Sequence, residues 1–234
     1  MTTPQTPAGS RADVERMQQR LSRKHPAHHI CTVETRLVVE GYPRSGNSLL
    51  TNMLFESSSF NARWDAVAHH THHLDNLRIA STFGIPKLIL VREPLAAIRS
   101  YHIYSGLPLD DCAEDYRHFY AGVLDLMERT AIVHFEDVLG DFRKVVAALN
   151  ALGDFGLSPG EEYAPLRTRA ERVIRERAAK RAAKMGAVSR HVAAPDPERD
   201  RLKAELSDTV AKHLRGKPEV FAIYDQVMGL RSGC

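Results

Sequence analysis

The chain of 234 residues contains no run of about 18 apolar residues, so the sequence predicts no transmembrane helix. It has only three cysteines, Cys31, Cys112 and Cys234, and their scattered positions lack the close spacing of a metal site. Such isolated cysteines are typical of reduced thiols in a cytoplasm. The first ten residues show neither the basic nor the apolar region of a signal peptide. These absences predict a cytoplasmic protein with no membrane partner.

The formal net charge of +3 is small, but it is unevenly distributed along the chain. Between Arg167 and His191 nine lysines and arginines face two glutamates, so this stretch carries +7 and the remainder −4. Concentrated basic character indicates an anionic partner at one site. A solvated helix face explains the same pattern equally well. No aromatic interleaving or recognition motif points to nucleic acid.

Short apolar runs separated by helical patterns indicate one α/β domain, for which the chain length is suitable. Runs at 36–41, 86–91 and 131–135 and a weaker one at 62–68 predict strands. They alternate little with polar residues, as is typical of parallel strands buried on both faces. One helix is expected to begin near residue 46. The other expected helices span 11–24, 74–83, 94–104, 110–129, 137–152, 161–185, 198–214 and 217–229.

The predicted architecture is a P-loop-like three-layer sandwich around a central parallel sheet of about four or five strands. Residues 1–35 are expected to form an N-terminal tail and a short helix. Residues 36–234 are expected to form a single domain, of which 159–234 is a helical C-terminal part.

The most informative stretch is 41–48, Gly-Tyr-Pro-Arg-Ser-Gly-Asn-Ser, between the first predicted strand and a helix. A turn of this kind directs backbone N–H groups and the helix dipole at one point, which suits a phosphate. The spacing of Gly41, Gly46 and Ser48 has the outline of a Walker A loop, but Asn47 stands where the lysine belongs. That loss argues against a nucleoside triphosphatase. A divergent P-loop small-molecule kinase and a turn without ligand remain as alternatives.

A second anion signal follows the strand at 86–91. Arg92 falls at the carboxyl end of that strand, the edge at which open α/β sheets bind ligands, and Ser100 lies about two helical turns later. A guanidinium fork and a hydroxyl at this edge suit a second phosphate. Together the two stretches resemble sulfotransferases: residues 43–48 match the 5′-phosphosulfate loop with Arg44 as its cation. Arg92 and Ser100 match the 3′-phosphate motif, with Glu93 in place of asparagine.

The resemblance spans about residues 36–142 and implies a sulfotransferase that uses 3′-phosphoadenosine 5′-phosphosulfate as co-substrate. The sulfonate group would pass to a hydroxyl of a carbohydrate or small metabolite, and this chemistry requires no metal. A non-catalytic module of the same fold that binds a nucleotide or an acidic partner is the alternative. The co-substrate ligands implied by the resemblance are Arg44, Ser45, Gly46, Asn47, Ser48, Arg92, Ser100, Phe135, Lys184 and Arg190.

Four histidines occupy five successive positions: His69, His70, His72 and His73. The segment 70–72 is similar to a Lys-Thr-His sequence of the family, which makes His72 the candidate general base and Arg44 the stabiliser of developing charge. An imidazole suits proton removal because its unperturbed pKa lies close to neutral pH. A shift in register would give the role to His70 or His73. A zinc site and a solvated histidine loop are alternatives, although neighbouring residues on an extended strand point to opposite faces.

Overall fold

The computed structural model describes residues 10–158, 162–185 and 197–231. Four parallel strands form one sheet in the order β2-β1-β3-β4, which confirms the predicted α/β fold with a parallel sheet. The strands are β1 (Leu37–Gly41), β2 (Val67–His69), β3 (Lys87–Val91) and β4 (Thr130–His134). Within the described ranges no helix has the length and apolarity needed to cross a membrane.

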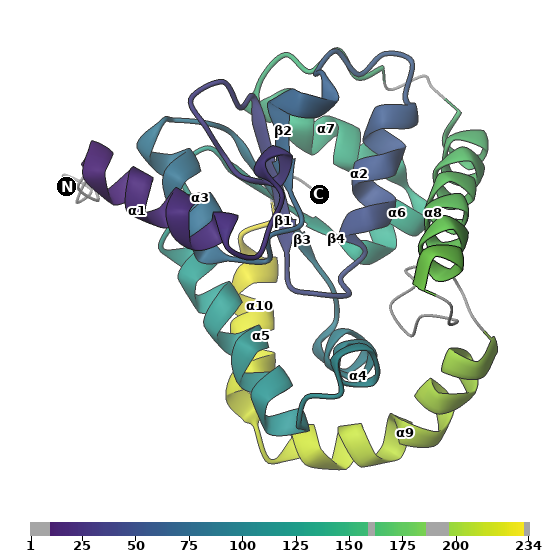
Figure 1. Ribbon diagram of the computed structural model, residues 1–234. Helices are drawn as coiled ribbons and strands as arrows, with labels where there is room; N and C mark the ends of the chain where they lie inside the picture. The colour runs from purple at the N-terminus through teal and green to yellow at the C-terminus, as the bar shows by residue number, and fades with distance from the viewer. Residues whose placement is uncertain (1–9, 159–161, 186–196, 232–234) are drawn as a thin grey trace.

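Helices cover both faces of the sheet (Figure 1). One layer comprises α1 (Arg11–Ser22), α3 (Leu74–Thr82), α5 (Leu109–Leu124) and α10 (Pro218–Gly229). The other comprises α2 (Asn47–Glu56), α6 (Phe135–Gly140), α7 (Phe142–Leu152) and α8 (Tyr163–Met185). Below the sheet in the view of Figure 1 lie α4 (Pro94–Ser105) and α9 (Pro197–Arg215), and short 3₁₀ turns occur at Ala27–His29 and Trp64–Ala66.

Alternate strand residues supply the two hydrophobic cores between these layers. Val38 and Ile89 belong to the core beside α3 and α5, whereas Val39 and Leu88 belong to the core beside α2 and α7. All five residues of β3 are buried, which explains why its sequence reads as a continuous apolar run. Each such buried aliphatic side chain stabilises the fold by roughly 1.5–3 kcal/mol.

The strand order places a topological switch point between β1 and β3. From β1 the chain crosses to β2 at one edge of the sheet, and from β3 it crosses to β4 at the other. The loops that leave the carboxyl ends of β1 and β3 therefore diverge and open a crevice, the usual ligand position in such sheets. One loop enters α2 and the other enters α4, where Glu93 caps the helix by accepting from the N–H groups of Leu95 and Ala96 at 2.9 and 2.8 Å.

Some of the predicted boundaries were wrong. The strand predicted at 62–68 is shorter and is displaced to Val67–His69, because Trp64–Ala66 forms a 3₁₀ turn. The helix expected at 110–129 with an aspartate cap begins at Leu109 after Pro108 and ends at Leu124. It ends early because residues 125–129 must turn into β4.

The residues after β4 also differ from the prediction. Phe135 was expected to end the strand, but it begins α6 because His134 and Asp137 form a capping box there. The single helix expected at 137–152 is two helices, α6 and α7. They are separated by Asp141, whose φ of −147° and ψ of 76° interrupt the helical backbone.

Candidate functional site

A cavity of about 1560 Å³ lies at the carboxyl ends of β1 and β3. Typical small-molecule pockets measure about 300–1,000 Å³, so this one has room for a nucleotide and a second molecule. Its wall collects most of the residues predicted from the sequence: Arg44, Gly46, Asn47, Ser48, His72, Arg92, Ser100 and Phe135. The two predicted anion motifs therefore meet in one cavity.

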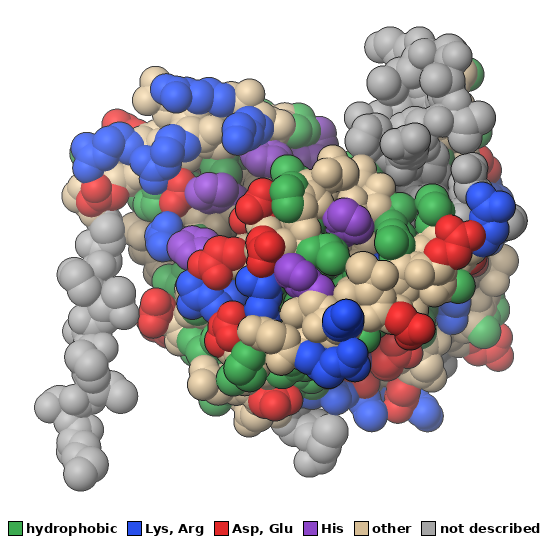
Figure 2. Space-filling model, turned by 90° about the horizontal axis from the view of Figure 1, so that it is seen from below, with side chains coloured by type: hydrophobic (Ala, Val, Ile, Leu, Met, Phe, Trp, Pro, Cys, Tyr) green, Lys and Arg blue, Asp and Glu red, His purple; other side chains and the backbone are tan. Residues whose placement is uncertain are grey.

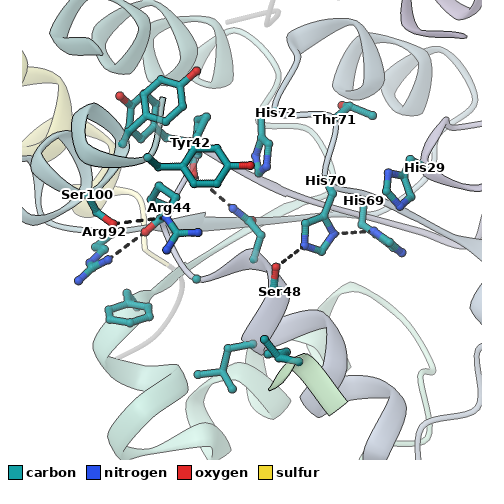
Figure 3. Close-up of a pocket in the computed structure, with 18 of the residues that line it drawn as sticks. His29, Tyr42, Arg44, Ser48, His69, His70, Thr71, His72, Arg92 and Ser100 are labelled. Carbon is teal, nitrogen blue, oxygen red and sulfur yellow. Dashed lines mark hydrogen bonds between the residues drawn. The ribbon is translucent and has the colours of Figure 1, made fainter. Parts of the chain in front are cut away.

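Arg44 and Arg92 form one corner of this cavity (Figure 3). The Arg92 Nη1 atom donates a hydrogen bond of 2.9 Å to the backbone carbonyl of Arg44, and its guanidinium lies over the Phe135 ring at 4.4 Å. Arg44 Nε donates to the hydroxyl of Ser100 at 3.4 Å, and the Arg44 guanidinium lies 5.0 Å from the Tyr104 ring. Burial lowers the pKa of Arg92, but a guanidinium remains protonated in proteins. This corner is positively charged and suits a phosphate or sulfonate.

The loop between β1 and α2 has a backbone that only certain residues tolerate. Gly46 has a φ of 99°, and a Cβ built on it would lie 2.5 Å from the Phe135 ring, so glycine is required there. Arg44 also has a positive φ of 66°, which is uncommon for a residue with a side chain. This backbone turns the chain directly from the strand into α2. The N-terminus of α2 therefore lies at the cavity. The N–H groups of its first turn have no acceptors within the helix.

Asn47 holds the loop together in the position where a Walker loop has lysine. Its side chain is 3 % exposed, and its Nδ2 atom donates to the carbonyls of Tyr42 and Gly41 at 3.2 and 3.5 Å. Its Oδ1 atom is buried and has no hydrogen-bond partner among the described residues. Buried polar atoms are normally satisfied, so this oxygen is consistent with a ligand donor close to the loop.

Ser45 does not reach the cavity wall. Its side chain is fully buried, and its hydroxyl lies 3.5 Å from the hydroxyl of Tyr120. Its N–H donates to the carbonyl of Tyr42 at 3.2 Å. Both polar groups of Ser45 are therefore engaged within the protein, and the loop offers the cavity Gly46, Asn47 and Ser48 instead.

A buried carboxylate, which the sequence reasoning missed, positions the histidine segment. Glu40 in β1 is fully buried and accepts hydrogen bonds from Thr71 N (3.0 Å), Thr71 Oγ1 (2.6 Å), His72 N (2.8 Å) and Asn76 Nδ2 (3.0 Å). These donors compensate for removing the carboxylate from water. The sequence does contain a signal for this role, because Glu40 is the one acidic residue in the otherwise apolar strand β1. Its effect is to fix residues 71–72 beside the carboxyl end of β1.

His72 has a defined tautomer in this arrangement. Its Nδ1 atom lies 2.7 Å from the carbonyl oxygen of Gly41, which can only accept, so Nδ1 carries the proton. In the neutral ring Nε2 is then an unprotonated acceptor. His72 is partly buried, lines the cavity and has a positive φ of 53°. The geometry is suitable for a general base.

The neighbouring histidines have different surroundings. His70 Nε2 lies 3.0 Å from Ser48 Oγ, and His70 Nδ1 lies 2.6 Å from His69 Nδ1. Burial is the main cause that holds the pKa of His70 well below its ordinary value. The neighbouring His69 and His72 lower this pKa further. Burial lowers the pKa of His69 to about 3, with a further contribution from His29. These rings are neutral at neutral pH.

His73 has a capping role instead. Its side chain accepts from the N–H of Asp75 at 3.1 Å at the start of α3. In the part of the chain that the structure describes, no group of three or more His, Cys, Asp or Glu side chains has a geometry that could hold a metal ion.

Basic and histidine side chains dominate the rest of the wall. Among the described residues that line the cavity are seven lysines and arginines and three acidic residues. Arg78 forms an ion pair with Asp75, Arg167 with Glu171 and Lys203 with Asp200. Eight of the twelve histidines also line it: His25, His28, His29, His69, His70, His72, His73 and His118. The molecule seen from below shows histidines scattered among basic, acidic and apolar side chains (Figure 2).

Two predicted ligands are not located by the structure. Lys184 lies in the last turn of α8, whose backbone is described there but whose Lys184 side chain is not, and Arg190 lies outside the described residues. The basic helix α8 reaches the cavity through other residues. Arg167 and Arg177 line the wall, and Arg177 lies over the Trp64 ring at 5.2 Å.

Comparison with models of protein families, with curated proteins and with solved structures gives no match to this chain.

Proposed function

We propose that this protein is a P-loop-like sulfotransferase that transfers a sulfonate group from 3′-phosphoadenosine 5′-phosphosulfate to a hydroxyl of a carbohydrate or small metabolite. The observation that carries the proposal is the hydrogen bond of 2.9 Å from Arg92 to the Arg44 carbonyl, within one cavity. This bond holds Arg92 against the loop that carries Arg44, and two guanidinium groups in one cavity suit a nucleotide with phosphates at both its 5′ and 3′ positions.

Each end of the nucleotide has suitable groups. The N–H groups at the start of α2 and the Arg44 side chain suit the 5′-phosphosulfate, since a helix N-terminus and a guanidinium both stabilise oxyanions. Arg92 and Ser100 suit the 3′-phosphate, and Phe135, which lies under the Arg92 guanidinium and lines the cavity, is the aromatic residue proposed to lie near the adenine. ATP lacks the 3′-phosphate and would leave the second set of groups without a ligand.

The position of His72 suits the chemical step. Nε2 removes the proton of the acceptor hydroxyl, whose oxygen bonds to sulfur as the bond between sulfur and the phosphate oxygen breaks. Hydrogen bonding of Nδ1 to the Gly41 carbonyl orients the ring and stabilises the charged form that results. Arg44 stabilises the negative charge that develops on the departing phosphate.

Asn47 favours this function over a small-molecule kinase. Its amide bonds to the carbonyls of Gly41 and Tyr42 and supplies no positive charge, whereas a kinase loop uses a lysine to neutralise the β- and γ-phosphates. A kinase would therefore lack its main electrostatic contribution at this position.

Thermal unfolding with adenosine 3′,5′-bisphosphate, the expected product, tests the binding part of the proposal. A ligand at a hundred times its Kd stabilises the folded state by about 2.7 kcal/mol, or roughly 5–10 °C for a chain of this size. Adenosine 5′-monophosphate and ATP with Mg²⁺ serve as controls and should give much smaller shifts. A shift with ATP and Mg²⁺ but none with the bisphosphate would favour the kinase instead.

Transfer of radiolabelled sulfonate to a pool of glycans and metabolites tests the activity. His72→Ala should abolish transfer and leave the bisphosphate shift unchanged. His102→Ala is a matched control, because His102 Nδ1 also bonds a carbonyl, that of Leu107 at 2.6 Å, but His102 does not line the cavity. Transfer by the His72 variant at the wild-type rate would exclude His72 as the base. Nucleotide binding without transfer to any acceptor would favour a non-catalytic module.

A further inference from the structure

Ser48, His70 and His69 form a continuous chain of side-chain hydrogen bonds at the start of α2 (Figure 3). Ser48 Oγ lies 3.0 Å from His70 Nε2, and the two Nδ1 atoms of His70 and His69 lie 2.6 Å apart. His69 is 2 % exposed, and its Nε2 atom has no hydrogen-bond partner among the described residues. This chain of three residues is not used by the general base His72.

Only two proton arrangements satisfy this geometry. The two Nδ1 atoms share one hydrogen bond, so one of them carries a proton and the other does not. If His70 Nδ1 is the donor, His69 is protonated at Nε2, and a buried N–H points at no acceptor. If His69 Nδ1 is the donor, His69 Nε2 is a bare lone pair, and His70 carries its proton at Nε2, toward Ser48.

The surroundings of His69 favour the second arrangement. Its ring packs edge-on against Trp64 with 5.0 Å between centroids, and the guanidinium of Arg177 lies over that same Trp64 ring at 5.2 Å. A nearby positive charge favours a lone pair over an N–H group. Buried N–H groups without acceptors are also rare in proteins.

We infer that His69 and His70 form a neutral relay that fixes the direction of the Ser48 hydroxyl. The relay runs from His69 Nδ1–H to His70 Nδ1, and from His70 Nε2–H to Ser48 Oγ. Because Ser48 Oγ already accepts from His70, its own proton is directed elsewhere. Ser48 thereby becomes a hydrogen-bond donor to an anion bound at the N-terminus of α2.

Burial keeps the relay uncharged. The pKa of His70 is held well below its ordinary value by burial and then by the neighbouring His69 and His72, and burial lowers that of His69 to about 3. His70 and His72 also have positive φ angles of 62° and 53°, so the backbone of this segment is held in an uncommon conformation. Glu40 fixes that conformation through Thr71 and the N–H of His72.

The relay makes Ser48 a directed donor, one position after Asn47, which stands where a Walker loop has its lysine. This part of the inference rests on the proposed function, since the anion would be the 5′-phosphosulfate. His70 acts through Ser48 and is therefore a positioning residue. The proton arrangement itself does not depend on which ligand binds.

Nitrogen-15 NMR of the ligand-free protein tests the proton arrangement directly. At neutral pH we expect His70 to be protonated at Nε2 and bare at Nδ1, and His69 to be protonated at Nδ1 and bare at Nε2. The reverse assignment for either ring, or a charged ring, would overturn the inference. This result is independent of whether the protein is a sulfotransferase.

Binding of adenosine 3′,5′-bisphosphate to variants tests the role of Ser48. Ser48→Ala and His70→Leu should each weaken binding about tenfold, because a hydrogen bond to a charged group is lost or misdirected. The double variant should bind no more weakly than Ser48→Ala alone, because the two residues act as one unit. Additive losses would show that His70 acts independently of Ser48.

A conservative variant separates positioning from proton transfer. His70→Gln places an amide N–H near the original Nε2–H and should restore binding to within about threefold of wild type. Failure of the glutamine to restore binding would contradict the donor role of His70. If the wild-type protein does not bind the bisphosphate at all, the proposed function fails, while the NMR result still decides the relay.

Discussion

Arg92 donates a hydrogen bond of 2.9 Å from its guanidinium to the backbone carbonyl of Arg44, which lies 48 positions earlier in the chain. The residue that follows β3 therefore holds the loop that follows β1. Both arginines line the same cavity. If the proposed nucleotide binds here, this contact keeps the groups for its two phosphates on one side of the cavity.

Arg92→Lys should weaken binding of adenosine 3′,5′-bisphosphate by about tenfold to a hundredfold. A lysine keeps the charge, but it cannot lie flat over Phe135 and also offer a planar fork to the Arg44 carbonyl and a phosphate. Isothermal titration calorimetry measures the change. Arg143→Lys is the control, because Arg143 is 69 % exposed, pairs with Asp141 and lies outside the cavity. Equal affinity in the two variants would contradict a role for Arg92 in binding.

Gly46→Ala should abolish nucleotide binding and destabilise the fold. The φ of 99° disfavours a side chain, and the new Cβ would meet Phe135 at 2.5 Å, so we expect a loss of about 2–4 kcal/mol in the free energy of unfolding. Gly84→Ala is the matched control. Its φ is 64°, but its Cβ would meet nothing within 4 Å, so it should cost only about 1 kcal/mol and leave binding intact. Urea unfolding and calorimetry of both variants check this.

Glu40→Gln should destabilise the protein by about 1–3 kcal/mol and lower kcat. The glutamine amide nitrogen would replace one carboxylate oxygen of Glu40. It would then face either the N–H of His72 or the donor groups of Thr71 and Asn76, so at least one buried donor would lose its acceptor. Residues 71–72 would then move relative to the β1 carboxyl end. Urea unfolding and a sulfonate transfer assay measure the two effects. Glu34→Gln, at an exposed position, should change neither by a measurable amount.

The protein should lose stability in acid because of its buried histidines. Burial lowers the pKa of His29 to about 4 and that of His69 to about 3, whereas both titrate near 6.5 in the unfolded chain. The unfolded state therefore binds more protons below pH 6.5, and the free energy of unfolding falls as the pH drops from 6.5 toward 4.

His29→Gln tests this pH dependence. The variant lacks one of the groups that take up a proton on unfolding, so its urea midpoint should change less steeply with pH in that range. Lys180→Gln, an exposed change on α8, should leave the acid slope as in the wild type. An unchanged slope in the His29 variant would show that this ring is protonated equally in both states.

The sequence by itself determined the main elements of the fold and the position of the glycine-containing loop between β1 and α2. Local patterns sufficed, because the apolar run of β3 and the glycine spacing of 41–48 each encode their structure within a few residues. Boundaries that depend on packing were predicted less well. The helix from 109 ends early because its chain must turn to pair β4 with β3.

Only the tertiary structure decided which polar groups meet. It joined Arg92 to the Arg44 carbonyl, turned the Ser45 hydroxyl toward Tyr120 and away from the cavity, and placed Glu40 beneath residues 71–72. It also fixed the tautomer of His72 through the Gly41 carbonyl. The physical reason is that these contacts join segments from about 30 to 75 positions apart. Their formation depends on strand order and register, which no local pattern in the chain specifies.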